Sequence, residues 1–570
     1  MSRIKCHALS KRSRKLLRTT WSHKSSWKQR AFRVVGTPVL ILGVNDIGLA
    51  RPDRLKWATI DGDGLPSMFY AGTQLRKALI FVHRWMGVSF CLLFLSWFAS
   101  GIVLMYWEYP AVSEADRLSR APVLDAAGIR LSPQEAYARL QTDLQPDHVK
   151  LGTFDGQPAY RFHFGDAESI VSAVDGKTLT EFPPEMTLRV ASSWAGQPPA
   201  EARVEENTEE DQWTVSEKFA DLRPMRKYSW PNGEQVYVST VTGDVEQYTT
   251  RASRMGAYFG AIPHWLYFTP LRKRASVWAR IVIWASGLGA VAALFGIVIG
   301  VSTYSPSKRY RYEGAPSSLP YTGQKRWHSI FGLIFGLLAC IWAFSGMLSM
   351  DPFPRLQGET WDSTGARLAE ALRGGSLHLA DFTEGPREAL ARLGSDFSVK
   401  EMELDSFAGE SVYLGTGERN QSRIVPVRGN AAAEFDRNKI LDVIGNAAKP
   451  YTLAEVRLVT RYESYYLDRR HRRPLPVIFV RLSDDKNSMY YIDPKTARIV
   501  QSYNSHARWN RWLYHGLHSM DVPWLYNHRP IWDIVVLILL AGGVALCVTS
   551  LVLAWRVLRR TFGKDFPGLS

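Results

Sequence analysis

Cysteine is scarce in this chain, with four among 570 residues. Cys91, Cys340 and Cys547 lie inside apolar runs and Cys6 lies near the start, so the two long polar stretches contain none. This distribution argues against disulfides, and the missing C-x-x-C-H motif excludes covalently attached haem. Clusters of iron and sulfur are held by several cysteine thiolates, and they are excluded for the same reason.

A dinucleotide-binding loop is also missing. The glycines of GLGAVAALFG, residues 287–296, lie within an apolar run, whereas the glycine loop that binds a dinucleotide follows a strand. We interpret these glycines as helix-packing residues. The sequence therefore carries no flavin or nicotinamide signature, and electrons for any redox reaction would come from an external donor.

Negative charge is absent from the first 45 residues, and the whole chain has a net charge of +16. A basic balance suggests nucleic acid or anionic lipid as partner. Because the basic residues lie beside long apolar runs, we expect membrane lipid and no nucleic acid. We interpret residues 1–77 as a basic cytoplasmic extension, and the alternative is that translation naturally begins at Met68.

Four apolar runs are long enough to cross a bilayer, which takes about 20 residues. Each is predicted to be a helix, because a lone span must satisfy its own backbone hydrogen bonds. The predicted spans are 78–107, 278–301, 327–350 and 530–555. Lys and Arg in the loop 302–326 and in the tail 556–570 place both on the cytoplasmic side. The long segments 108–277 and 351–529 are then outside.

Both outer segments are expected to form small α+β modules. Residues 132–141 (SPQEAYARLQ) and 452–463 (TLAEVRLVTRYE) have a helix-like pattern. Alternating apolar residues bounded by Gly, Pro and Asp predict β-hairpins in AYRFHF, SIVSAVDGKT, QVYVSTVTGD and SMYYIDPKTA.

The first and third spans repeat one another. When His83 is aligned with His328, identical residues recur at fixed spacings: Gly87 and Gly332, Trp97 and Trp342, Ser100 and Ser345, Gly101 and Gly346. The second and fourth spans match more weakly. His264 lies 14 residues before Trp278, and His518 lies 14 before Trp532. The pattern predicts two halves, each with one histidine at either end of a pair of spans.

These histidines are the main functional candidates, because polar side chains at membrane depth are costly. His83 and His328 are predicted near the cytoplasmic ends of their spans, and His264 pairs at the outer end with His518 or His515. His515 lies three residues before His518, on the same helical face, so the two compete. A single histidine there would be interpreted as a headgroup contact, but two at one register indicate a pair.

A pair of imidazoles suits haem iron better than zinc or a proton relay. Zinc usually has four protein ligands, and no second pair accompanies these histidines. A proton relay would need Asp or Glu in the spans, whose central parts have none. Haem supplies four equatorial nitrogens, so the protein gives only two axial ligands. We therefore expect metal ligation by His83, His328, His264 and His518, with His515 as the competitor.

Haem propionates would need cations near the membrane edges. Candidates for this cofactor contact are Arg84 and Arg326 on the inner side and Arg272, Arg274 and Arg511 on the outer side. Ordinary contact with lipid headgroups is the alternative for each of them. Trp97 and Trp342 are more readily explained as packing residues than as haem contacts. The loop DRRHRRP around His471 is predicted to be solvated, and its charge would attract an anionic substrate.

The sequence resembles the family of PepSY-associated transmembrane proteins in LRKALIFVHRWMG, KRWHSIFG, PHWLYF and HGLHSMDVP. The resemblance extends over nearly the whole chain from about residue 70. It implies a four-helix transmembrane bundle built as a two-fold repeat, with two α+β PepSY-like periplasmic domains, in a bacterial inner membrane with both termini cytoplasmic. It also implies two b-type haems and ferric-siderophore reduction.

An oxidoreductase of this kind would release Fe(II) outside the inner membrane during iron uptake, with quinol or a cytoplasmic reductase as donor. No separate catalytic side chain is predicted. Two alternatives stay open. The same scaffold could pass electrons to another periplasmic acceptor, or the chain could be a membrane-anchored PepSY binding or protease-regulating module without enzymatic activity.

Overall fold

The computed structural model describes residues 66–165, 167–208, 210–353, 363–394, 396–418 and 421–562. The chain divides into Met1–Leu65 and Pro66–Ser570, and every described residue belongs to the second unit. Most of the predicted extension 1–77, including the start at Met1, therefore lies outside the described residues. The first helix begins at Pro66, before the predicted boundary at residue 78.

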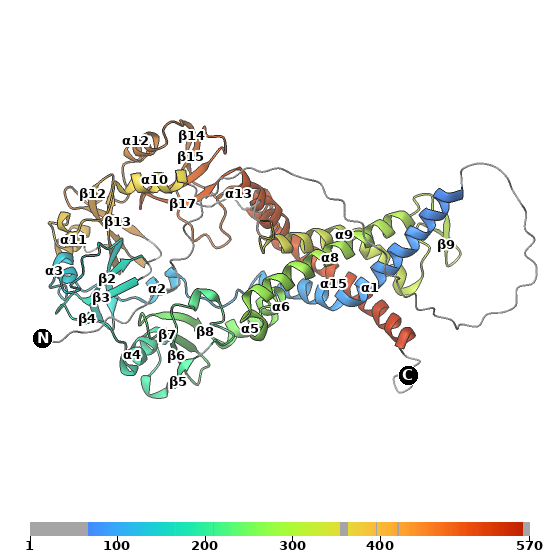
Figure 1. Ribbon diagram of the computed structural model, residues 1–570, viewed down its shortest axis with the longest axis horizontal. Helices are drawn as coiled ribbons and strands as arrows, with labels where there is room; N and C mark the ends of the chain where they lie inside the picture. Colours follow the sequence, from blue (N-terminus) through green and yellow to red (C-terminus); the bar gives the residue numbers. More distant parts are fainter. Residues whose placement is uncertain are drawn as a thin grey trace, which may run out of the picture. The chain divides into compact units, whose positions relative to one another are not determined.

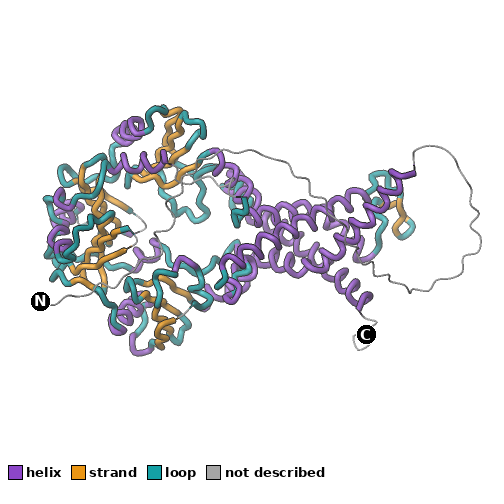
Figure 2. The backbone as a smooth tube through the Cα atoms, viewed as in Figure 1, coloured by secondary structure: helices purple, strands orange, loops and turns teal. Residues whose placement is uncertain are grey.

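Four long helices carry the apolar runs: α1 (Pro66–Leu104), α8 (Ala275–Thr303), α9 (Gly323–Leu348) and α15 (Ile531–Phe562). Each contains a stretch that is long and apolar enough to cross a membrane. The four predicted spans are thus confirmed as helices, and α15 extends seven residues beyond the predicted end at residue 555. Figures 1 and 2 show the four helices running side by side.

The helices form a closed ring in which α1 packs on α8, α8 on α9, α9 on α15, and α15 on α1. Small residues allow the backbones to approach closely, as expected between helices in a bilayer. A side chain on Gly543 would come within 2.3 Å of the Phe98 ring, and one on Gly542 within 2.3 Å of Phe335. Glycine is therefore required at both positions of α15 to seat a phenylalanine from a neighbouring helix.

Two long segments leave one end of the bundle, and a short one leaves the other. The short loop between α8 and α9 holds a two-stranded hairpin, β9 (Tyr310–Tyr312) and β10 (Ala315–Ser317). The segment between α1 and α8 contains α2 (Glu114–Arg120), α3 (Pro133–Ala138), β1 (His148–Phe154), β2 (Gln157–Phe164), β3 (Ala167–Ser172), β4 (Thr178–Leu179), α4 (Pro184–Ala195), β5 (Arg203–Thr208), β6 (Met225–Ser229), β7 (Gln235–Ser239), β8 (Val245–Thr249), α5 (Arg251–Phe259), α6 (Ala261–Trp265) and α7 (Thr269–Arg272).

The second long segment repeats much of this order. It contains α10 (Ser363–Arg373), α11 (Pro386–Leu393), β11 (Glu401–Phe407), β12 (Glu410–Thr416), β13 (Ser422–Pro426), α12 (Arg437–Ala447), β14 (Leu453–Val459), β15 (Val477–Leu482), β16 (Met489–Asp493), β17 (Arg498–Tyr503), α13 (Ser505–Asn510), a π-helix η6 (Arg511–Gly516) and α14 (Pro523–Tyr526). In the first segment a helix precedes four antiparallel strands, and in the second segment a helix precedes three. In both segments a further helix then precedes four more strands.

The two segments share one sheet. Its seven strands run in the order β13-β12-β11-β1-β2-β3-β4, so β1 of the first segment pairs with β11 of the second, with Lys150 opposite Glu403. Figure 1 shows β12 and β13 beside β2 and β3. The apolar core against this sheet contains Leu151 and Tyr160 from one segment and Met402 and Tyr413 from the other. The segments are thus joined by a common sheet and core.

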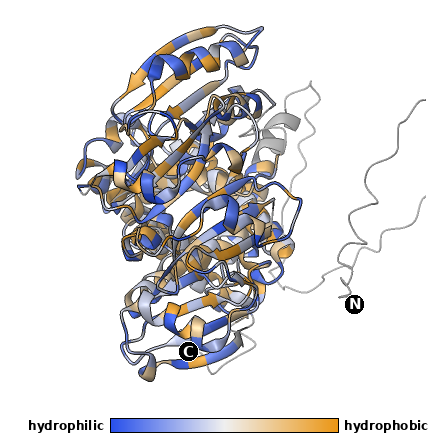
Figure 3. Cartoon of the chain, turned by 90° about the vertical axis from the view of Figure 1, so that its left-hand side faces the viewer, coloured by the Kyte–Doolittle hydropathy of each residue, from blue (hydrophilic) through white to orange (hydrophobic). Residues whose placement is uncertain are grey.

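Each segment also has a four-stranded sheet of its own, β5-β6-β7-β8 in the first and β14-β15-β16-β17 in the second. The predicted hairpin runs lie on β2, β3, β7 and β16, and the predicted helix at 132–141 is α3. Figure 3 shows hydrophilic and hydrophobic residues interspersed over the strands and helices, as expected for half-buried elements.

The helix predicted at 452–463 is wrong, because residues 453–459 form strand β14. β14 pairs along its length with β15, whose sequence VIFVRL is almost entirely buried. The hydroxyl of Thr452 lies 3.1 Å from Oγ of Ser483, the residue that follows β15, whereas at the start of a helix this hydroxyl would act as the cap. Long-range pairing with a buried strand therefore overrides the local helical pattern.

Candidate functional site

His83 on α1 and His328 on α9 lie side by side near one end of the bundle. The centres of their rings are 6.3 Å apart, and the ring planes are inclined by 35°. Nδ1 of His83 donates to the carbonyl oxygen of Ala292 at 3.0 Å. Because a carbonyl only accepts, Nδ1 of His83 carries the proton and Nε2 keeps its lone pair.

His328 is oriented by two hydroxyls of α15. Its Nδ1 lies 3.4 Å from Thr549 Oγ1 and 3.3 Å from Ser550 Oγ. Both hydroxyls donate their own protons to the carbonyl of Leu546, at 2.7 and 2.9 Å. They are therefore left to accept from Nδ1–H of His328, so Nε2 of this ring is also the unprotonated nitrogen.

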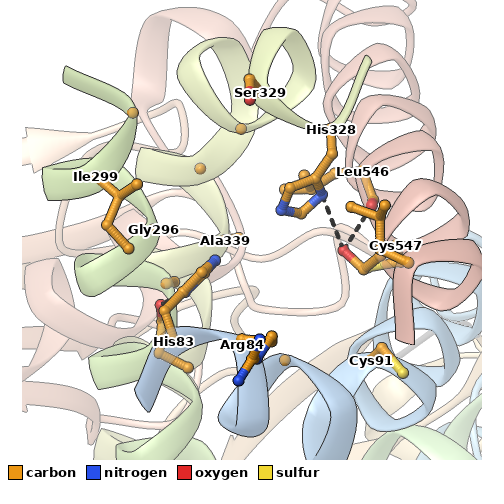
Figure 4. A pocket seen from close by; sticks show the side chains of 18 of the residues that line it. His83, Arg84, Cys91, Gly296, Ile299, His328, Ser329, Ala339, Leu546 and Cys547 are labelled. Atoms are coloured by element: carbon orange, nitrogen blue, oxygen red, sulfur yellow. Dashed lines mark hydrogen bonds between the residues drawn. The ribbon is translucent and has the colours of Figure 1, made fainter. Parts of the chain in front are cut away.

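A cavity of about 380 Å³ surrounds this pair, a size within the range of small-molecule sites. Residues of α1, α8, α9 and α15 line it, and most of them are apolar. Figure 4 shows His83 and His328 reaching into it from α1 and α9. A Cβ atom added to Gly87 would have no neighbouring atom within 4 Å, and a Cβ atom added to Gly332 would lie 3.9 Å from its nearest neighbour. Each glycine stands four residues after its histidine, and its lack of a side chain leaves room beside the histidine ring.

His264 and His518 form a second pair near the other end of the bundle. Their ring centres are 6.0 Å apart and their planes are inclined by 72°. His264 lies on the short helix α6, and His518 follows the π-helix η6. The two pairs are held by different elements and differ in ring inclination, but each brings two imidazoles to a similar separation.

The α1 and α9 helices hold this second pair through matching residues. Nδ1 of His264 lies 3.1 Å from both the Trp97 carbonyl and Ser100 Oγ, and Nδ1 of His518 lies 3.1 Å from Ser345 Oγ. The Ser100 hydroxyl donates to the Ser96 carbonyl at 2.6 Å, and the Ser345 hydroxyl to the Trp342 carbonyl at 3.2 Å. These hydroxyls accept from Nδ1–H, so Nε2 carries the lone pair in both rings.

Burial keeps the second pair neutral. Loss of solvation lowers the pKa of His264 to about 3, with the neighbouring His518 adding to the effect. Loss of solvation likewise lowers the pKa of His518 to about 4. Neutral imidazole is the form that binds metals.

His515 is not a member of the pair. Its ring lies 4.7 Å from that of Tyr514, and its backbone carbonyl accepts from Ser519 and Asp521. Residues three apart share a face of an α-helix, but His515 lies in a π-helical turn, which is wider, and His518 lies beyond it. The structure therefore brings His518, and not His515, to His264.

The five predicted cations fall in different places. Arg84 lines the cavity and packs on the Phe81 and Trp85 rings. Arg326 is not among the cavity residues, because it donates to Ser317 Oγ at 2.9 Å. Arg274 is exposed at the start of α8.

Arg272 and Arg511 are buried at the end of the bundle that holds the His264–His518 pair. Arg272 packs on the Trp278 ring at 4.7 Å, and Arg511 donates to the carbonyls of Ser464 and Asp521 at 2.5 and 2.6 Å. Nε of Arg272 and Nη1 of Arg511 are buried, and neither has a hydrogen-bond partner among the described residues. A buried charged donor without a partner is costly, so both atoms suit an anionic group that the protein itself does not provide.

Several site residues were not predicted from the sequence. The serines and tryptophans of the repeat were recognised, but their contacts to the second histidine pair were not. Trp342 also packs on Phe98, with ring centres 5.7 Å apart, so its predicted packing role is confirmed. Thr549 and Ser550 were missed, although two hydroxyls inside the apolar run of α15 are a usable signal.

The fold and the site together define a polytopic membrane protein with paired, half-buried imidazoles at two levels of a four-helix bundle. The model of one family, the PepSY-associated TM region, matches residues 81–391 and 325–568. The chain belongs to this family. A comparison with curated proteins gives no match.

Proposed function

We propose that this protein is a di-haem b electron-transfer protein of the bacterial inner membrane that reduces ferric siderophores on the periplasmic side. The observation that carries the proposal is the close pair of imidazoles at each end of the bundle, whose Nδ1 atoms contact the protein and leave Nε2 available. Nδ1 partners of this kind orient metal-binding histidines and strengthen them as ligands.

The spacing of the rings would suit two imidazoles that ligate one metal ion. Imidazole nitrogen binds a transition metal at about 2.0–2.1 Å, which puts two coaxial ring centres about 6.3–6.5 Å apart. The observed separations are 6.3 and 6.0 Å. Among the described residues, no group of three or more His, Cys, Asp and Glu is placed to hold a metal ion. Two protein ligands suit haem, which brings its own equatorial nitrogens.

The surroundings also fit haem. The cavity at the His83–His328 pair is mainly apolar, with Arg84 and Lys325 among its lining residues. At the other pair, Arg272 and Arg511 offer unpartnered donors for propionates. When bound, haem would supply reversible one-electron chemistry at its iron, and ligation by two histidines would favour electron transfer over oxygen binding. The protein's part is to orient the imidazoles and exclude water.

The two pairs lie at different depths, as a path through a bilayer requires. Seventeen residues separate His83 from Ser100 on α1, and His328 from Ser345 on α9. At 1.5 Å per helical residue this is about 25 Å, close to the thickness of the hydrocarbon core. Electrons would enter at the His83–His328 pair and leave at the His264–His518 pair.

Charge supports an orientation with the His83–His328 pair toward the cytoplasm. The described ends of the spans on that side are rich in Lys and Arg: Arg76, Lys77, Lys308, Arg309, Arg311, Lys325, Arg326, Arg556, Arg559 and Arg560. The positive-inside rule places such residues in the cytoplasm. Both termini are then cytoplasmic and both long segments periplasmic. The matching serines and tryptophans of α1 and α9, and the matching element order, support a two-fold repeat.

We infer the substrate from the resemblance to siderophore-reducing members of the family. Hydroxamate and catecholate oxygens hold Fe(III) better than Fe(II), so adding one electron loosens the complex. The protein carries no dinucleotide signature, so the donor is membrane quinol or a cytoplasmic reductase. Transfer to another periplasmic acceptor, or a role as a PepSY binding module, are the competing functions.

The visible spectrum of the purified protein tests the proposal. We expect a Soret band, sharp α and β bands after dithionite, and two haems per chain by pyridine haemochrome. A ferric hydroxamate or catecholate complex should reoxidise the reduced protein, with Fe(II) captured by a ferrous chelator. His83→Ala and His328→Ala should each remove one and the same haem, whereas His378→Ala, at an exposed histidine, should remove none. A folded but colourless protein would reject the proposal, and reoxidation only by another acceptor would reject the substrate.

A further inference from the structure

Residues 468–474, DRRHRRP, form a cationic loop between β14 and β15 that we call the arginine loop. Arg469 donates to the carbonyl of Ser519 at 3.1 Å and pairs with Asp521 at 2.9 Å. Ser519 directly follows His518. Arg470 forms an ion pair with Glu108, just beyond the end of α1. The arginine loop therefore lies beside the end of the bundle that holds the His264–His518 pair.

The arginine loop is held in one conformation by its own contacts. The carboxylate of Asp468 accepts hydrogen bonds, at 3.0, 2.6 and 2.8 Å, from the backbone N–H groups of Arg470, Arg472 and Arg473. Two tyrosine hydroxyls fasten its other end: Tyr462 donates to the Arg473 carbonyl and Tyr466 to the Pro474 carbonyl, both at 2.8 Å. A ligand of this loop would therefore bind cations that are already in position, which lowers the entropic cost of binding.

Part of the charge of the loop is not neutralised. Arg469 and Arg470 have carboxylate partners, but Arg472 is exposed and, within the described ranges, forms no ion pair. Burial, and then the charge of Arg472, lowers the pKa of Arg470. His471 is exposed next to it, with its ring on Tyr462 at 5.0 Å. Like charges held close together are relieved by an anion.

We propose that the arginine loop docks an anionic metal chelate, so that the physiological acceptor is a ferric complex with net negative charge. This inference rests on the proposed function and names its substrate class. One electron leaves the protein and reduces Fe(III) to Fe(II) within the chelate, and the loop neither forms nor breaks a bond. Its arginines attract the complex and hold it beside the His264–His518 pair, where electrons leave.

Two substitutions and an anion that cannot be reduced by the protein test the docking. Arg472→Glu reverses the unpaired charge, and Arg428→Glu is the matched control at an exposed arginine in the loop after β13. Binding of the redox-inert hexacyanocobaltate(III) trianion is measured by calorimetry on the full-length protein. We expect Arg472→Glu to weaken binding about tenfold and Arg428→Glu to leave it unchanged. No binding to the wild-type protein, or equal effects of both substitutions, would overturn the proposal.

Electron transfer gives a second measurement. The reduced protein is mixed with hexacyanoferrate(III), a trianion, or hexaammineruthenium(III), a trication. We expect Arg472→Glu to lower the rate constant about tenfold for the trianion only, and the wild-type rate for the trianion to fall with salt. If the protein bound two haems and Arg472→Glu changed the rate constants for both acceptors by the same factor, anionic docking would be overturned and the proposed function would stand. A protein without haem would overturn the proposed function, while the calorimetry still decides whether the loop binds anions.

Discussion

The hydroxyl of Ser345 lies 3.1 Å from Nδ1 of His518. Ser345 is on a long apolar helix, whereas His518 is on a short turn outside it, so the contact joins the bundle to the segment that follows. Ser100 makes the same contact with His264, also at 3.1 Å. A serine at the same register of α1 and α9 thus sets the orientation of each histidine in the second pair.

Loss of this hydroxyl should weaken one haem site. We expect Ser345→Ala to lower the haem affinity of the His264–His518 site by about 10–100-fold, as is usual when the partner of a ligating histidine is removed. Haemin titration of the apoprotein, followed by the Soret band, measures the effect. Ser302→Ala is the control, because that hydroxyl donates only to the Ile299 carbonyl of its own helix. Unchanged affinity in Ser345→Ala would contradict the role of the serine.

The two competing histidines should differ sharply. His518 faces His264, whereas His515 packs on Tyr514. We expect His518→Ala to retain one haem per chain and His515→Ala to retain two. Pyridine haemochrome quantifies both variants, with circular dichroism as the check on folding. If His515→Ala lost a haem and His518→Ala kept both, the assignment of the pair would be reversed.

Gly296 on α8 should be needed for the ring position of His83. A side chain at Gly296 would lie 2.7 Å from Cε1 of His83, closer than two carbon atoms pack, so the ring must move. At Gly346 the corresponding atom is 3.5 Å from Cε1 of His518, an ordinary contact. We expect Gly296→Ala to shift the electron paramagnetic resonance signal of one haem or to lose that haem. Gly346→Ala is the matched control and should resemble the wild type.

Glu246 on β8 should make stability depend on pH. Burial, and then the neighbouring Asp244 carboxylate, raises its pKa to about 7 from 4.5. The folded protein therefore retains a proton that the unfolded chain releases, and the stabilising contribution, complete below about pH 4.5, is lost as the pH rises through about 7. Glutamine does not ionise, so we expect the Glu246→Gln variant to avoid up to about 3 kcal/mol of this loss in the free energy of unfolding.

Thermal unfolding in detergent checks this expectation. The wild-type Tm should fall from pH 5 to pH 8 by more than that of Glu246→Gln. Asp175→Asn is a suitable control: hydrogen bonds from Ser172 and from the Lys177 backbone lower the pKa of that exposed carboxyl, so it is ionised at both pH values. An identical pH dependence in the wild type and Glu246→Gln would show that Glu246 is not the group responsible.

The sequence predicted the apolar helices well, because a run of about 20 apolar residues has few alternatives in a bilayer. It also predicted that His83 and His328 come together, since they stand at one register of two similar helices. The prediction of a helix at 452–463 failed because the conformation of that stretch is not set by its own residues. The helical or extended state of that stretch depends on β15, whose residues lie about 20 positions further along the chain.

By itself, the sequence determined the four spans and the histidines at their two ends, because hydropathy and helical register are properties of neighbouring residues. Only the tertiary structure decided between His515 and His518, since a π-helical turn directs the two rings differently. It also decided that β1 pairs with β11, which joins the two long segments in one sheet. The tertiary structure also decided which serine and threonine hydroxyls contact Nδ1 of the histidines. Such contacts join residues up to a few hundred positions apart, and no local pattern records them.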